Sequence, residues 1–221
     1  MMTNMFSTFD PATSTSTSMN WCMAMLGMMM MPASFWVLPN RNSNIMNKIM
    51  GSLHMEFKTL LGKSTATTMM FISMFMFILM NNIMGLMPYI FTSSSHMTFT
   101  LALALPMWMS IMMFGWINKT TMMLAHMIPS GTPPMLMPFM VMIETISNII
   151  RPGALAVRLM ANMTAGHILM ALLGEKIKSS TMIVMMIMIL QMVIMIFESA
   201  VAVIQAYVFS ILSTLYSSEV I

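Results

Sequence analysis

Long apolar runs separated by short polar connections constrain the fold of this chain more than any other feature. Only nine Lys and Arg and six Asp and Glu occur among 221 residues, and 58% of the residues are hydrophobic. About a quarter of the residues are charged in a typical soluble domain, so this chain could not cover a water-facing surface. Several runs reach or approach the roughly 20 residues that a helix needs to cross a bilayer. Transmembrane barrels alternate polar and apolar residues instead, so the sequence predicts an all-α polytopic membrane protein.

The remaining composition excludes several classes of site. The formal net charge is +3, but the few cations are scattered between apolar runs, which does not indicate a nucleic-acid partner. Cys22 is the only cysteine, so it predicts neither an intrachain disulfide nor a metal site. We expect no cofactor and no bound metal.

The chain is predicted to form a single membrane domain over residues 1–221. We expect about five membrane helical elements and one interfacial amphipathic helix. In chain order these are a polar tail over residues 1–18, a first span over 19–38, the interfacial helix over 41–63, the second and third spans within 66–117, and a long helical hairpin with polar stripes over 135–216.

The interfacial helix is predicted from a two-faced pattern. Lys48 and Lys58 lie opposite a helical face rich in Ile, Leu, Met and Phe, although Glu56 interrupts that face. Such a helix is expected to lie on the membrane surface. In the second span, Asn81 and Asn82 are better suited to holding helices together by hydrogen bonds than to ion passage.

The hairpin is predicted from two apolar stretches, residues 135–173 and 181–216, which are too long for ordinary spans. With a rise of about 1.5 Å per residue each helix would exceed about 50 Å, against a hydrocarbon core of about 30 Å. Ordinary tilts of roughly 0 to 40° cannot absorb that excess. The helices are therefore either broken or steeply inclined, and Pro152 should permit a bend in the first of them.

The orientation is predicted from the cations in alternate loops, because Lys and Arg are enriched on the inner side of a membrane. This count places the N-terminus outside and the C-terminus inside. The inner loops carry Arg41, Lys48, Lys58, Lys63 and Lys119, and the outer loop carries Lys176 and Lys178.

Both long stretches carry polar side chains on one helical face. In the second stretch, Gln191, Glu198 and Gln205 recur every seven residues. A charge at mid-membrane costs roughly 2.5 to 3.5 kcal/mol, so these stripes should face protein or water. The first stretch places five polar residues within a sector of roughly 80° at 3.6 residues per turn: Glu144, Asn148, Arg151, Arg158 and Asn162.

Two explanations remain open for the two arginines of the first stripe. Arg151 and Arg158 either neutralise glutamates within the hairpin or serve in ion movement. His167 lies off the stripe, and it is as readily a packing residue as a partner of Glu198 on the facing helix.

The run PSGTPPMLMPFMVMIETISNIIRPGALAVRLMANMTAGHILMALLG, residues 129–174, closely resembles the signature of subunit a of F-type ATP synthases. The likeness is strongest to the mitochondrially encoded form, often called subunit 6, of the mitochondrial inner membrane. The resemblance implies a stator that binds no nucleotide and conducts protons through two aqueous half-channels to a rotating ring of c subunits.

The resemblance also implies roles and partners. Arg158 would be the fixed cation that faces the ring carboxylates, whereas Asn148, Arg151 and Gln191 would support the stripes. The implied partners are the c-subunit ring, other subunits of the membrane sector (Fo) and peripheral stalk, lipid, protons and water. The residues implied to line or border the half-channels are Glu144, Asn162, His167, Glu198 and Gln205.

Two other classes fit the pattern less closely. A secondary transporter could use Pro129 to Pro138 as a broken-helix substrate site, and the chain could also be another respiratory proton-pump subunit. Either class predicts activity without a c ring. Co-purification of the chain with c subunits would therefore distinguish an ATP synthase subunit from both classes.

Overall fold

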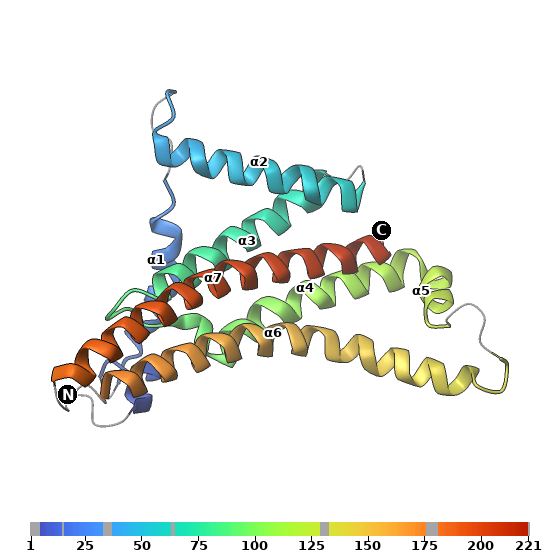
Figure 1. Cartoon of the computed structure of the whole chain (residues 1–221). Coiled ribbons are helices and arrows are strands. Elements are labelled where there is room, and N and C mark those ends of the chain that lie inside the picture. The colour runs from blue at the N-terminus through green and yellow to red at the C-terminus, as the bar shows by residue number, and fades with distance from the viewer. Residues whose placement is uncertain are drawn as a thin grey trace.

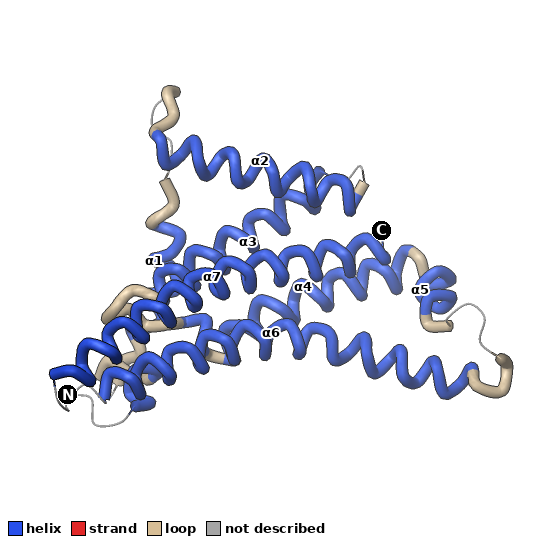
Figure 2. The backbone as a smooth tube through the Cα atoms, in the orientation of Figure 1, coloured by secondary structure: helices blue, strands red, loops and turns tan. Residues whose placement is uncertain are grey.

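The computed structural model describes residues 5–14, 16–32, 37–62, 65–128, 133–175 and 181–220, and their regular structure is helical, without strands (Figures 1 and 2). The short helices are η1 (Met5–Phe9), η2 (Met19–Cys22), α1 (Met23–Met29), η3 (Ser93–Ser95) and α5 (Thr120–His126). The long helices are α2 (Arg41–Leu61), α3 (Thr65–Gly85), α4 (Met97–Asn118), α6 (Met137–Glu175) and α7 (Thr181–Val220).

The predicted all-α polytopic membrane fold is confirmed. Four helices within the described ranges are long and apolar enough to cross a membrane: Thr67–Gly85, Met97–Asn118, Met137–Glu175 and Val184–Val220. The orientation stays a prediction, because Lys63, Lys176 and Lys178 lie outside the described residues.

The segment predicted as the first span, residues 19–38, contains a shorter helix than the pattern indicated. Helix α1 ends at Met29, and residues 33–36 lie outside the described part of the chain. Pro32 explains this end, because a proline disfavours helical geometry in the residue before it and donates no backbone bond. Helix α1 packs against α3 at Gly27, where a Cβ atom would lie 3.2 Å from Asn81 Oδ1.

Helix α2 lies across one side of the bundle (Figure 1) and contacts α3 and α7. Its Lys48 and Lys58 are exposed, so its predicted two-faced character is confirmed. Glu56, which interrupted the sequence pattern, accepts a hydrogen bond from Tyr207 Oη of α7 at 3.1 Å. The buried apolar side chains of α2 are Leu53, Phe57 and Leu61.

Helices α3 and α7 run antiparallel in the centre of the bundle. Near one end, Asn82 Nδ2 donates to the Ala202 carbonyl at 3.3 Å, which confirms that this asparagine holds two helices together. Near the other end, Phe71 shares an apolar groove with Ser217 and Val220. Small side chains on the buried face of α7 allow this close approach.

Helices α4 and α6 are also antiparallel. Ala104 of α4 lies beside Pro152 and Leu155 of α6, whereas Met112, two turns later in α4, lies beside Glu144. Helix α6 remains helical through Pro152 and bends near its middle (Figure 1). The alternative of broken long helices is therefore wrong, since α6 and α7 are continuous over 39 and 40 residues.

We predict that α6 and α7 tilt more than about 40° from the membrane normal in a structure determined within a lipid bilayer. Helix α6 has 39 residues, so at about 1.5 Å per residue it is roughly 58 Å long, and fitting it within a core of about 30 Å needs a tilt of about 60°. Helix α4, with 22 residues, is the internal control and should tilt within the ordinary range. Equal, small tilts of all three helices would contradict this prediction.

Candidate functional site

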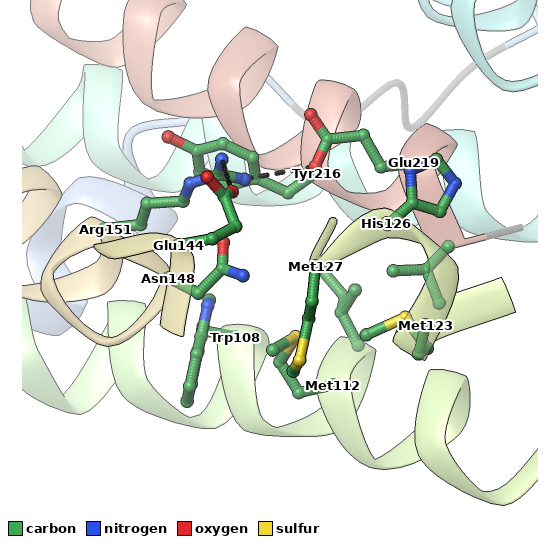
Figure 3. Close-up of a pocket in the computed structure, with 12 residues that line it drawn as sticks. Trp108, Met112, Met123, His126, Met127, Glu144, Asn148, Arg151, Tyr216 and Glu219 are labelled. Atoms are coloured by element: carbon green, nitrogen blue, oxygen red, sulfur yellow. Dashed lines mark hydrogen bonds and ion pairs between the residues drawn. The ribbon is translucent and has the colours of Figure 1, made fainter. Parts of the chain in front are cut away.

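Arg151 lines a pocket formed by α4, α5, α6 and the C-terminal turn of α7 (Figure 3). Its Nη1 donates to Glu219 Oε2 at 3.1 Å, and its Nη2 donates to Glu144 Oε1 at 3.5 Å. Its Cζ atom also lies 5.0 Å from the centre of the Tyr216 ring, a cation–π geometry. One guanidinium therefore ties the first half of α6 to the end of α7.

The pocket around Arg151 is open, and its lining combines charged and polar groups with apolar side chains of α4 and α5. Its volume is about 170 Å³, which leaves room for several water molecules. Asn148 and His126 add an amide and an imidazole to its lining. Arg151 and Glu144 are partly exposed, and ion pairs of this kind contribute only up to about 1 kcal/mol to stability. The arrangement is thus better suited to hydrating and holding charges than to stabilising the fold.

Arg158 lies two turns further along α6 and is exposed, as is Asn162. It forms no ion pair with any residue that the structure describes. The two explanations left open by the sequence therefore divide between the arginines: Arg151 pairs with Glu144 inside the hairpin, whereas Arg158 does not pair with a glutamate there. The exposed α6 surface around Arg158 also carries small side chains, namely Ala154, Ala161 and Ala165.

Glu198 is buried between the two long helices and is 8% exposed. Its carboxyl group packs against Gly166 of α6 so closely that a Cβ atom at that position would overlap it. Neither carboxyl oxygen has a hydrogen-bond partner among the described residues, and the same holds for His167 Nε2. His167 follows Gly166 directly, and its ring meets Phe9 edge-on at 6.4 Å. No hydrogen bond between His167 and Glu198 occurs in the described part of the chain.

The structure sorts the predicted residues into three places. Glu144, Asn148 and Arg151 share the open pocket, Arg158 and Asn162 lie on the exposed flank, and His167 and Glu198 lie at the buried α6–α7 contact. At about 1.5 Å per residue, Arg158 is roughly 10 Å along α6 from Arg151 and roughly 12 Å from Gly166. The remaining two, Gln191 and Gln205, are partly buried on α7, two turns on either side of Glu198.

Sequence reasoning missed Glu219, Tyr216 and Gly166. A signal for Glu219 was present, because positions 191, 198, 205 and 219 continue one seven-residue spacing with a single gap at 212. Gly166 carried no comparable signal, because the packing role of a glycine within a helix can be predicted only when the facing residue of the neighbouring helix is known.

Comparison with known proteins identifies relatives along the whole chain. The family model described as ATP synthase A chain matches residues 3–218. The chain is 58% identical over 225 residues to ATP synthase subunit a of Anopheles gambiae, 59% over 224 residues to that of Locusta migratoria and 57% over 223 residues to that of Drosophila melanogaster. Each alignment covers 100% of both chains.

We predict that Gly166→Ala lowers the amount of correctly assembled chain in membranes. The added methyl group overlaps the Glu198 carboxyl group, and overpacking of this kind typically costs about 1 to 3 kcal/mol. Gly153→Ala is the matched control, because a Cβ atom there meets nothing within 4 Å. The measurement is the abundance and thermal stability of the assembled chain. Adding Glu198→Ala to Gly166→Ala should restore both, and equal behaviour of the two single alanine variants would refute the contact.

Proposed function

The chain belongs to the ATP synthase A chain family, and we propose that it is the proton-conducting stator of the Fo sector of an F-type ATP synthase. In this role it leads protons through two aqueous half-channels to the carboxylates of a c-subunit ring and couples their flow to rotation and ATP synthesis. It acts in the mitochondrial inner membrane beside the ring and other Fo and peripheral-stalk subunits, and it binds no nucleotide itself. We place its N-terminus in the intermembrane space and its C-terminus in the matrix.

The observation that carries this proposal is the exposed Arg158 near the middle of a long apolar helix. A cation at that depth costs several kcal/mol in lipid, so it needs a carboxylate or water on its open side. No described residue of this chain supplies the carboxylate. Ala161 and Ala165 beside it are small enough for another helix to approach closely. A ring of c subunits with one carboxylate per outer helix would satisfy both features.

Arginine suits the boundary between two half-channels. Its guanidinium stays protonated at any relevant pH, so it attracts a carboxylate but does not pass a proton on. A nearby cation favours the ionised form of a ring carboxylate, whereas burial in the ring favours the neutral form. The membrane potential supplies about 2.3 kcal/mol per charge per 100 mV. Because these contributions are similar in size, a ring carboxylate can lose a proton beside Arg158 and regain one without a deep energy minimum.

The two polar clusters on either side of Arg158 support two separate half-channels. The cluster of Glu144, Arg151 and Glu219 lies toward the start of α6, and Glu198 with His167 lies toward its end. Carboxyl and imidazole groups can hold and release protons, whereas an amide such as Asn162 can only orient water. We assign Glu144, Asn162, His167, Glu198 and Gln205 to the walls of the half-channels, with Asn148, Arg151 and Gln191 as supports.

The alternatives gain no support from the structure. The full-length family match favours neither a secondary transporter nor another respiratory pump subunit. Residues 129–132, which would begin a broken-helix substrate site, lie outside the described residues.

We predict that Arg158→Ala abolishes ATP-coupled proton transport but leaves membrane insertion intact, because it removes the cation that faces the ring. Arg158→Lys should also be badly impaired, since a compact ammonium lacks the forked guanidinium geometry. Val157→Ala, at an exposed neighbouring position, is the control. ATP-driven proton pumping and proton-driven ATP synthesis in membrane vesicles provide the measurement, and synthesis retained by Arg158→Ala would overturn the proposed function.

We predict that His167 and Glu198 are functionally coupled. Because Glu198 packs on the residue next to His167, each single replacement should slow proton flux more than it reduces assembly. A double-mutant cycle with His167→Gln and Glu198→Gln should give a combined effect smaller than the product of the single effects. Simple additivity would show that the two side chains act independently.

A further inference from the structure

Glu56 is an acidic residue on a flank of α2 that also carries the apolar side chains of Ile49 and Leu60. Its Oε2 atom accepts a hydrogen bond from Tyr207 Oη of α7 at 3.1 Å, and it forms no ion pair with any residue that the structure describes. Tyr207 lies within the apolar stretch Val184–Val220. In such surroundings a carboxylate and a phenol hydroxyl each need a polar partner. The bond is therefore a directional link between α2 and α7.

The part of α2 that carries Glu56 is fixed independently of this bond. Leu53 and Phe57 are buried in the core, and Phe57 is completely inaccessible. His54 Nδ1 is hydrogen-bonded to Thr68 Oγ1 of α3 at 3.2 Å. Apolar packing and the bond to α3 thus hold α2 in place, so Glu56 offers α7 an acceptor at a fixed position.

The buried face of α7 does little to define how that helix is rotated about its own axis. Most of its buried side chains are small, and its buried hydroxyl groups donate to carbonyls of the preceding turn of the same helix. Such side chains permit close packing, but their donors form no bond to a neighbouring helix. Other side chains must therefore select one rotation. The small buried residues are Ala202, Ala206, Ser210, Ser213, Thr214 and Ser217.

Two further bonds of α7, one on each side of Tyr207, constrain its rotation less. Asn82 donates to the main-chain carbonyl of Ala202 at 3.3 Å, and every turn of a helix carries such carbonyls. Arg151 binds Glu219 in the last turn of α7, where the Glu219 side chain is 57% exposed. The bond from Tyr207 joins two specific side chains between these points, so it is the one suited to fixing the rotation.

Tyr207 and Glu198 lie on opposite sides of α7, which runs between α2 and α6 and contacts both (Figure 1). They are nine residues apart, which at about 100° and about 1.5 Å per residue gives a rotation of about 180° over roughly 13 Å. Holding Tyr207 toward α2 therefore directs Glu198 toward α6, where its carboxyl group packs against Gly166. Rotating α7 by a single residue would turn Glu198 away from this contact by about 100°.

We propose that Glu56 is a positioning residue for Glu198. By accepting the hydrogen bond of Tyr207 it fixes the rotation of α7, so that the Glu198 carboxyl group is directed toward α6. The predicted interfacial helix α2 then takes part in proton transfer by holding α7, although Glu56 and Tyr207 carry no proton themselves in this role. The inference rests on the proposed function and adds these two residues to it.

Passive proton conduction through the membrane sector tests the positioning role. With the nucleotide-binding sector stripped from native membranes and a potassium diffusion potential imposed, Glu56→Leu and Tyr207→Phe should each lower the proton flux several-fold per assembled complex. Glu56→Gln should keep most of the flux, because its amide oxygen still accepts the hydroxyl. The double variant Glu56→Leu/Tyr207→Phe should be no worse than either single variant, since all three lack the same bond. Wild-type flux in both single variants, or multiplied losses in the double variant, would overturn the proposal.

Two matched controls remove hydroxyl groups that do not join α2 to α7. Tyr89→Phe changes a tyrosine that is fully exposed, and Ser52→Ala removes a hydroxyl that donates to the Ile49 carbonyl within α2. Both should conduct protons at the wild-type rate. A loss in Tyr89→Phe as large as that in Tyr207→Phe would show that the flux responds to any lost tyrosine hydroxyl, which would contradict the assignment.

The contact between Glu198 and Gly166 provides a second measurement, which a purely structural role of Tyr207 would not affect in the same direction. If the bond to Glu56 holds Glu198 against position 166, releasing it lets α7 rotate away from the methyl group of Gly166→Ala. Adding Tyr207→Phe should therefore raise the amount of assembled Gly166→Ala chain, whereas adding Tyr89→Phe should not. An unchanged or smaller amount in Gly166→Ala/Tyr207→Phe would show that Tyr207 does not hold Glu198 in this orientation.

The two levels of inference fail separately. If Arg158→Ala retains coupled transport, the proposed function is wrong. If Arg158→Ala is inactive while Glu56→Leu and Tyr207→Phe conduct normally and Tyr207→Phe does not relieve Gly166→Ala, only the positioning role of Glu56 is wrong.

Discussion

The high free energy of an unpaired charge in hydrocarbon is the constraint on which the rest of this structure depends. With so few ionisable residues in the chain, each one inside the membrane needs a partner, water or a protein neighbour. Arg151 is surrounded by two carboxylates and an aromatic ring. Arg158, on the same helix, has none of these within the described residues. The contrast between two arginines in one apolar helix is the basis for proposing that the c-subunit ring covers the surface around Arg158.

The length of α6 determines how far apart its polar clusters lie. A helix of ordinary span length would hold one polar cluster near mid-membrane, whereas α6 is long enough for a cluster on each side of Arg158. Pro152 of α6 is buried against α4. Ala202 of α7 lets α3 approach closely, and Gly166 of α6 lets the Glu198 side of α7 approach closely. The packing that supports the hairpin thus also separates the two clusters along it.

The sequence predicted the class of fold and most of the polar residues, because hydrophobic length and helical periodicity are local properties. It predicted that Glu144, Asn148 and Arg151 share a face, and these residues do line one pocket. It could not predict that Glu219 completes the ion pairs of Arg151 or that Gly166 receives the Glu198 carboxyl group, since both contacts depend on the register between α6 and α7. Apolar composition alone did not predict that helix α1 ends at Met29, before Pro32.

The two ends of the hairpin differ in their electrostatics, and this difference bears on the direction of proton flow in the proposed role. At the Arg151 end, one cation is shared by two carboxylates in an open pocket, so each carboxylate has a positive partner. At the Glu198 end, a single buried carboxyl group packs against Gly166, without a described cation paired to it. A carboxyl group without a counter-charge is stabilised by taking up a proton. In the proposed role, the Glu198 side is therefore suited to collecting protons before they reach the ring, and the Arg151 side is suited to releasing them, because its carboxylates already have a positive partner.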